Sequence, residues 1–313
     1  MSLRSLSIIL ILSFFCLPKV VSQEIEIVEN SQGILFMEDD DSILFYQTAN
    51  KDLNGTYSRS NYIHPLYSLD GKVITEDFPD DHLHHRGIFW AWHQLYIGEK
   101  RIGDGWEIKD FEWRVKQVKQ LLSPDNIKKI AIEVDWLSPL WVDQDGNRKP
   151  VINEVTELSV YPKNETYRRI DFNITINATE PATRIGGSED AKGYGGFSAR
   201  VKLSDGVEFA GPEGIITPEN LPIKSTGWID MVNLTDNSGE SGLCIIEHPS
   251  NPGYPNPWIL RSKGSMQNPV WPHPGAKPVP LSMETPVSLG YSLIIHDQLT
   301  PDEITQIYQN YIK

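Results

Sequence analysis

Residues 170–176 read Ile-Asp-Phe-Asn-Ile-Thr-Ile, a strict alternation of apolar and polar side chains. Successive side chains of an extended chain point to opposite faces, so this period of two predicts a strand with one buried face. Residues 130–136, Ile-Ala-Ile-Glu-Val-Asp-Trp, repeat the pattern. Half-buried strands of this kind are typical of antiparallel sheets. The two segments therefore predict an all-β, antiparallel protein.

Elements at both ends of the chain extend this prediction. Residues 34–37 and 43–46 are apolar runs on either side of an acidic turn, which predicts a hairpin. Residues 287–296 predict a further strand. After it, Thr300, Pro301 and Glu303 supply an N-cap, a first helical residue and a capping box, so one C-terminal helix should dock on the sheet. Prolines and glycines are scattered rather than gathered in a linker, which favours one β-sandwich domain over residues 23–313.

The first residues have the pattern of a secretory signal. Arg4 is followed by an apolar run over residues 6–15, and small residues precede Gln23. We predict a signal peptide over residues 1–22 and a mature protein that is periplasmic or secreted. Its loss removes Arg4 and Lys19 and changes the formal charge from -14 to -16. This acidity argues against nucleic-acid binding, and no later run of about 18 apolar residues predicts a membrane span.

The densest chemical segment covers residues 80–93 and contains four of the eight histidines. In an extended chain His82 and His84 would point to one face and His85 to the other, so a shared site needs a bend. Three interpretations stay open. The imidazoles are structural, or they bind a metal together with His248, or one acts as an acid or base while Arg86 holds a substrate carboxylate or sulfate. We favour the third.

Two other segments carry candidate site residues. The proline-rich loop 247–258 contains His248, Tyr254 and Trp258, and is either a pocket wall or a stiff surface connection. Residues 192–200 contain three glycines beside Tyr194 and Arg200, which would let a ligand approach the backbone.

In their order, these motifs resemble the PmoA-like family of exported bacterial proteins. The segments that carry the resemblance are residues 64–67, 81–90, 193–197, 248–252 and 291–296. Leu83 stands where the family usually has proline. The resemblance implies an antiparallel β-supersandwich similar to galactose mutarotase and a role in polysaccharide degradation. It also implies an activity like that of the oligosaccharide dehydratase of ulvan degradation, which makes an unsaturated uronic acid at a non-reducing end.

Under this hypothesis the protein is a lyase that removes water from a glucuronate or iduronate end of an anionic oligosaccharide. The catalytic candidates are His84, His85, His248 and Tyr194, and the substrate-binding candidates are Arg86, Arg59, Arg200, Trp90, Tyr254 and Trp258. No cofactor is expected, with a divalent metal at the histidines as an alternative. Two other functions stay open: a non-catalytic binding protein for anionic oligosaccharides, and a metal-dependent sugar hydrolase or epimerase.

Overall fold

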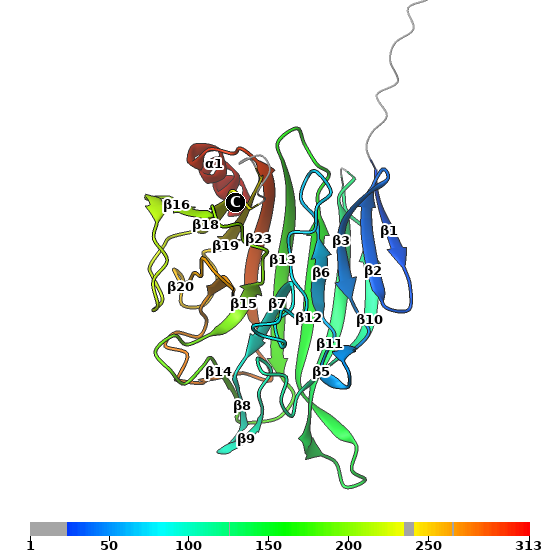
Figure 1. Ribbon diagram of the computed structural model, residues 1–313. Helices are drawn as coiled ribbons and strands as arrows, with labels where there is room; N and C mark the ends of the chain where they lie inside the picture. Colours follow the sequence, from blue (N-terminus) through cyan, green and yellow to red (C-terminus); the bar gives the residue numbers. More distant parts are fainter. Residues whose placement is uncertain (1–23, 125, 235–240, 265) are drawn as a thin grey trace, which may run out of the picture.

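The computed structural model describes residues 24–124, 126–234, 241–264 and 266–313 (Figure 1). The predicted signal peptide, residues 1–22, lies outside the described residues. In the described part of the chain, no helix is long and apolar enough to cross a membrane.

The larger of two main sheets has nine strands, and each hydrogen-bonded pair is antiparallel. In sheet order the strands are β10 (Glu112–Leu121), β11 (Lys128–Val142), β12 (Arg148–Val160), β13 (Tyr167–Ala178), β23 (Val287–Asp297), β19 (Ser241–Glu247), β18 (Trp228–Val232), β16 (Glu208–Gly211) and β17 (Gly214–Ile216). The two segments predicted as strands from their alternation are β11 and β13 of this sheet.

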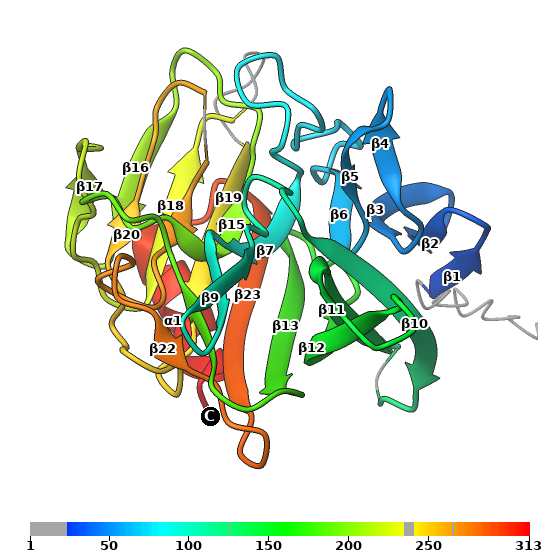
Figure 2. The ribbon, with the colours of Figure 1, turned by 90° about the horizontal axis from the view of Figure 1, so that it is seen from below.

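The second main sheet has six strands, also antiparallel. In sheet order they are β1 (Ile25–Glu29), β2 (Gly33–Glu38), β3 (Asp41–Gln47), β6 (Tyr62–Leu66), β7 (Ile88–Trp92) and β15 (Gly195–Ala199). The predicted N-terminal hairpin is β2 and β3. In Figure 2, β1, β2 and β3 lie at one side of the molecule and β16, β17 and β18 at the other.

Three small antiparallel sheets complete the strands. They are β22 (Val279–Pro280), β14 (Thr183–Gly186), β8 (Gln94–Ile97) and β9 (Lys100–Gly103); β20 (Trp258–Ile259) with β21 (Asn268–Pro269); and β4 (Lys51–Leu53) with β5 (Thr56–Arg59).

The main core lies between the two large sheets. On β13, Ile170 and Phe172 are buried in it while Asp171 faces the other way, as the alternation predicts. On β7, the ring of Trp90 contacts Phe172 at a centroid distance of 6.2 Å and so joins the two sheets. The prediction of an all-β, antiparallel sandwich is confirmed.

The helix α1 (Pro301–Tyr311) covers the outer face of the nine-stranded sheet. Thr300 caps it, and the side chain of Glu303 accepts a hydrogen bond from the backbone N–H of Thr300, which completes the capping box, as predicted. Ile304 and Ile307 pack against Ile294 of β23, whose neighbours along the strand face the main core. The predicted C-terminal helix is confirmed.

Candidate functional site

Three histidines come together because the chain turns after Pro79 instead of running straight. The backbone N–H of His82 donates to Pro79 O at 3.0 Å, and that of His85 donates to His82 O at 2.9 Å. The rings of His82 and His85 stack with centroids 4.5 Å apart, and His84 lies edge-on to His85, also at 4.5 Å. We call His82, His84 and His85 the histidine cluster. This turn supplies the bend that an extended segment lacks.

Arg200 fastens the histidine cluster to its surroundings. Its Nε donates to Glu76 at 2.6 Å, and Nη2 and Nη1 donate to the Asp81 carboxylate at 2.6 and 3.1 Å. Nη1 also lies 3.4 Å from Nδ1 of His85. A guanidinium can only donate, so Nδ1 accepts, and neutral His85 carries its proton on Nε2. Arg200 is 3% exposed and already paired, so it positions His85 and is not free to bind a substrate carboxylate.

Burial keeps His84 and His85 neutral. Desolvation, followed by the charges of His82 and His93, lowers the pKa of His84 to about 4. Desolvation also lowers the pKa of His85, with His84 as the next cause. Glu107 lies 3.5 Å from Nδ1 of His84, and partial burial raises the pKa of its carboxyl group. At pH 7 His84 is therefore an unprotonated base that still has access to solvent, its side chain being 12% exposed.

Trp106 and Tyr194 form an aromatic wall beside the histidine cluster. The centroid of Trp106 lies 6.3 Å from His85, 5.3 Å from His93 and 5.4 Å from Tyr194. Tyr194 is partly exposed, and the guanidinium of Arg261 lies 5.7 Å from its ring. Trp106 thus connects His85 and His93 to the phenol of Tyr194 and to the cation beside it.

Arg261 supplies positive charge at this end of the wall. Its guanidinium donates to the backbone carbonyls of Glu219, Leu260 and Asn220, and within the described residues it forms no ion pair. Lys263 follows on the same loop and lines a cavity of about 300 Å³ together with Arg200, Glu76 and Asp205, so the charges of that cavity are mixed. The positive charge of Arg261 itself can attract an anionic ligand although the whole chain is acidic.

Arg86, expected to bind substrate, is a buried structural group. It is fully buried, with Nη1 donating to Leu83 O at 3.0 Å and Nη2 donating to Tyr57 O. Its Nε lies 3.4 Å from Asp77, and its guanidinium stacks 3.5 Å from the Phe78 ring. The prediction that Arg86 contacts a substrate is wrong, because its donors hold the loop before the histidines.

Arg59 is equally inaccessible. It is fully buried, stacks 3.8 Å from the Trp113 ring, and donates from Nη2 to Trp90 O at 2.9 Å. Desolvation, followed by the charge of Arg86, lowers its pKa to about 9. Its expected role in substrate binding is corrected to a place in the core.

Trp90 and Trp258 are also core residues. Both are fully buried. Trp90 contacts Phe172 and Phe197, and Trp258 pairs through its backbone with Ile223. Neither indole face is available to a sugar, so the expectation that they stack on substrate is wrong.

The histidine cluster lies on the side of β7 that faces away from Phe172. Phe89 and Trp90 are successive strand residues and point to opposite faces. Trp90 contacts Phe172 of the nine-stranded sheet, whereas Phe89 lies 6.3 Å from the ring of His85.

His248 and Tyr254 lie on the other side of the molecule. His248 lines a groove with Asp171, which faces away from the core on β13. The hydroxyl of Tyr254 lies 2.9 Å from that of Tyr308 on α1. The expectation that these two residues join the histidine cluster is wrong, because both sheets intervene.

A metal site made of His82, His84 and His248 is excluded for the same reason. In the described part of the chain, no group of three His, Cys, Asp or Glu side chains is placed to hold a metal ion.

Three residues beside the site escaped the sequence analysis: Trp106, Glu107 and Arg261. The pair Asp104-Gly105 signals a turn just before Trp106, but no motif there indicates chemistry. Arg261 lies 67 positions after Tyr194, which it contacts, so only the folded chain reveals the pair.

The described geometry can be set beside known proteins. A family model described as a family of unknown function (DUF6807) matches residues 34–309. No curated protein matches the chain.

Proposed function

Because that match covers most of the chain, the protein belongs to the DUF6807 family, and we propose that it removes water from the uronic acid at the non-reducing end of an anionic oligosaccharide. Oligosaccharides of the ulvan type, ended by glucuronate or iduronate, are the proposed substrates. One observation carries the proposal: Trp106 contacts both His85, the ring neighbour of neutral His84, and Tyr194, beside which the guanidinium of Arg261 lies. The resemblance to PmoA-like proteins supports it further.

His84 is the proposed base. The C5 proton of a uronate is weakly acidic, and its removal needs an unprotonated acceptor that substrate can reach. His84 meets both conditions, whereas His85 is 2% exposed and is held by Arg200. His85 is therefore assigned to positioning its neighbour.

Tyr194 is the proposed acid. As His84 takes the C5 proton, the electron pair forms the C4–C5 double bond and the C4–O bond breaks. The hydroxyl group leaves as water with the phenolic proton of Tyr194, and solvent returns the proton from His84 to the phenolate. This assignment replaces His248 and Tyr254, which lie across the molecule.

Arg261 is the proposed partner of the substrate carboxylate. Negative charge develops on that carboxylate as the C5 proton leaves, and a fixed cation stabilises it. Lys263 follows two residues later on the same loop. We also propose that the protein acts in the periplasm or as a secreted enzyme, following the predicted signal peptide over residues 1–22.

The test combines a defined substrate with three variants. Purified protein is mixed with glucuronate- and iduronate-ended oligosaccharides, and mass loss of one water and ultraviolet absorbance of the new double bond are followed. His84→Gln and Tyr194→Phe should lower the rate by about 10²–10⁴-fold. Arg261→Gln should lower kcat and also raise KM, because this cation would both bind the carboxylate and stabilise the charge that develops on it. The matched control is Arg114→Gln, which removes a half-exposed arginine of β10 that pairs with Asp135 of β11.

Each result has a defined meaning. Full turnover in both His84→Gln and Tyr194→Phe would remove the site assignment. Oligosaccharide that binds and returns unchanged would identify the rival function, a binding protein for anionic oligosaccharides.

A further inference from the structure

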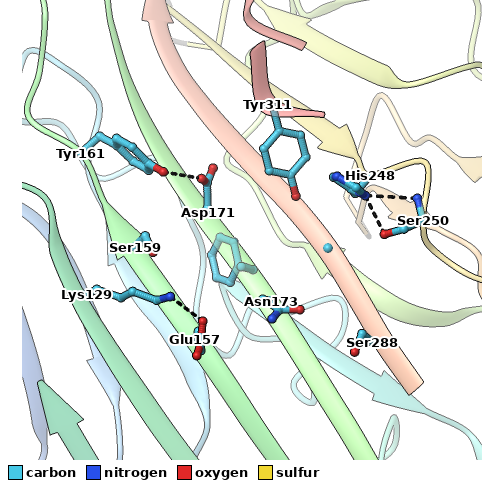
Figure 3. A pocket seen from close by; sticks show the side chains of 12 residues that line it. Lys129, Glu157, Ser159, Tyr161, Asp171, Asn173, His248, Ser250, Ser288 and Tyr311 are labelled. Atoms are coloured by element: carbon cyan, nitrogen blue, oxygen red, sulfur yellow. Dashed lines mark hydrogen bonds and ion pairs between the residues drawn. The ribbon is translucent and has the colours of Figure 1, made fainter. Parts of the chain in front are cut away.

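A groove of about 340 Å³ lies on the outer face of the nine-stranded sheet, beside the end of α1 (Figure 3). We propose that this groove binds an uncharged saccharide, at a site separate from the histidine cluster. The inference does not rest on the proposed elimination reaction. The volume of the groove lies within the range of about 300–1,000 Å³ that is usual for small-molecule sites.

The groove is built by side chains that the sheet alternation turns outward. Asn173 and Asp171 project from β13 on the face opposite Phe172, and His248 and Tyr311 close one side (Figure 3). A Cβ atom at Gly290 would lie 2.9 Å from the Cβ of His248 and 3.2 Å from the Tyr311 hydroxyl. The absence of a side chain at Gly290 therefore lets these two rings approach the sheet.

Charges in the groove are balanced. Lys129 pairs with Glu157 at 2.5 Å. Asp171 accepts from Nε and Nη2 of Arg169 at 2.7 and 2.6 Å and from the Tyr161 hydroxyl at 2.8 Å. With every lining charge already paired, the groove offers no excess charge to an ion, and an uncharged ligand suits it best.

The remaining groups match the hydrogen bonding of sugar hydroxyls. The backbone N–H of Ser250 donates to Nδ1 of His248 at 3.1 Å, so the neutral ring carries its proton on Nε2 and can donate from there. The Tyr311 hydroxyl and the Asn173 amide can both donate and accept. The Tyr311 ring stands edge-on to His248 at 5.2 Å, which holds the imidazole in place. Mixed donors and acceptors beside aromatic rings favour a polyhydroxyl ligand over a purely apolar one.

Calorimetry tests the groove directly. The probes are uncharged hexasaccharides of glucose, xylose, mannose and galactose, with a glucuronate oligosaccharide of equal length for comparison. At least one uncharged probe should bind more tightly than the glucuronate probe. Asn173→Ala and Tyr311→Phe should each weaken that binding by about fivefold, the effect of one lost hydrogen bond. Asn173→Trp fills the groove and should abolish it.

Two controls make the test decisive. Glu133→Ala removes an exposed side chain of β11 outside the groove and should bind like the native protein. His84→Gln should also keep its binding, so a failure of the proposed elimination would not affect this result. Absence of binding by every uncharged probe, unchanged binding in Asn173→Trp, or a preference for the glucuronate probe would each overturn the proposal.

Discussion

Arg86 illustrates how a residue in a chemical motif can serve the fold alone. Its guanidinium is surrounded by Asp77, the Phe78 ring and the carbonyls of Leu83 and Tyr57. A buried cation needs partners to be stable, and here Nη1 and Nη2 donate to backbone carbonyls of two loops and so tie these loops together. The adjacent histidines therefore owe their placement partly to a residue that never meets a ligand.

Replacement of Arg86 should accordingly affect stability first. Arg86→Met leaves the 5%-exposed Asp77 with one cationic partner fewer and frees two carbonyls, so the free energy of unfolding should fall by about 3 kcal/mol. Urea denaturation at pH 7 measures this change. Lys119→Met, which breaks only an exposed pair with Glu133, is the control and should cost less than about 1 kcal/mol. A normally stable Arg86→Met protein would contradict the structural role.

A second prediction at the scale of residues concerns the pKa of His84. The base must be unprotonated, and its pKa of about 4 keeps it so at any higher pH. As the pH falls, kcat/KM should therefore decline through about 4, whereas a solvent-exposed histidine would lose its base function near 6.5. Initial rates across this range distinguish the two. An acid limb near 6.5 would show that His84 is not the base.

At the scale of elements, α1 depends on its N-terminal cap. The N–H of Glu303 donates to the Thr300 hydroxyl at 3.3 Å, and the N–H of Thr300 donates to the Glu303 carboxylate at 2.8 Å. This reciprocal pair satisfies donors that a helix start leaves open. The helix then covers Cys244. This residue is fully buried, and burial raises the pKa of its thiol.

Loss of the cap should weaken this element measurably. Thr300→Ala should lower the free energy of unfolding by about 1 kcal/mol. The control Gln306→Ala removes an exposed side chain from the middle of the same helix and should change it by less than about 0.5 kcal/mol. Thermal and urea unfolding of both proteins check the difference, and equal stabilities would contradict the importance of the capping box.

At the scale of the whole molecule, buried titratable groups make stability depend on pH in opposing directions. Burial lowers the pKa of His64 to about 4, and burial raises the pKa of Glu247 to about 7. His64 contributes stability that is present above its unfolded pKa near 6.5 and is lost as pH falls through about 4. Glu247 contributes stability that is present below its unfolded pKa near 4.5 and is lost as pH rises through about 7.

Single replacements should separate these two contributions. Relative to the native protein, His64→Gln should lose less stability when the pH is lowered from 7 to 4.5. Glu247→Gln should lose less when the pH is raised from 5 to 8.5. The comparison uses urea denaturation of each protein at both pH values, so a constant cost of either substitution cancels. Parallel pH curves for variant and native protein would show that the group does not titrate differently on folding.

The two candidate sites also belong to this scale. The histidine cluster lies on the side of β7 that faces away from the core, and the groove lies on the side of β13 that faces away from the core. The core separates them. Their separation follows from alternation on two strands, Phe89 against Trp90 and Asp171 against Phe172. Sequence motifs alone had placed His248 and His84 in one site, because order along the chain does not reveal which face a loop reaches.

By itself, the sequence determined the kind of element in its most regular segments. Period two predicted β11 and β13, and Thr300 with Glu303 predicted the start of α1, because these signals act between near neighbours. Only the tertiary structure decided which side chains meet. It buried Arg59, Arg86, Trp90 and Trp258, and it brought Trp106 and Arg261 to Tyr194. Those outcomes depend on turns and on sheet packing between segments far apart in the chain, and no local pattern encodes them.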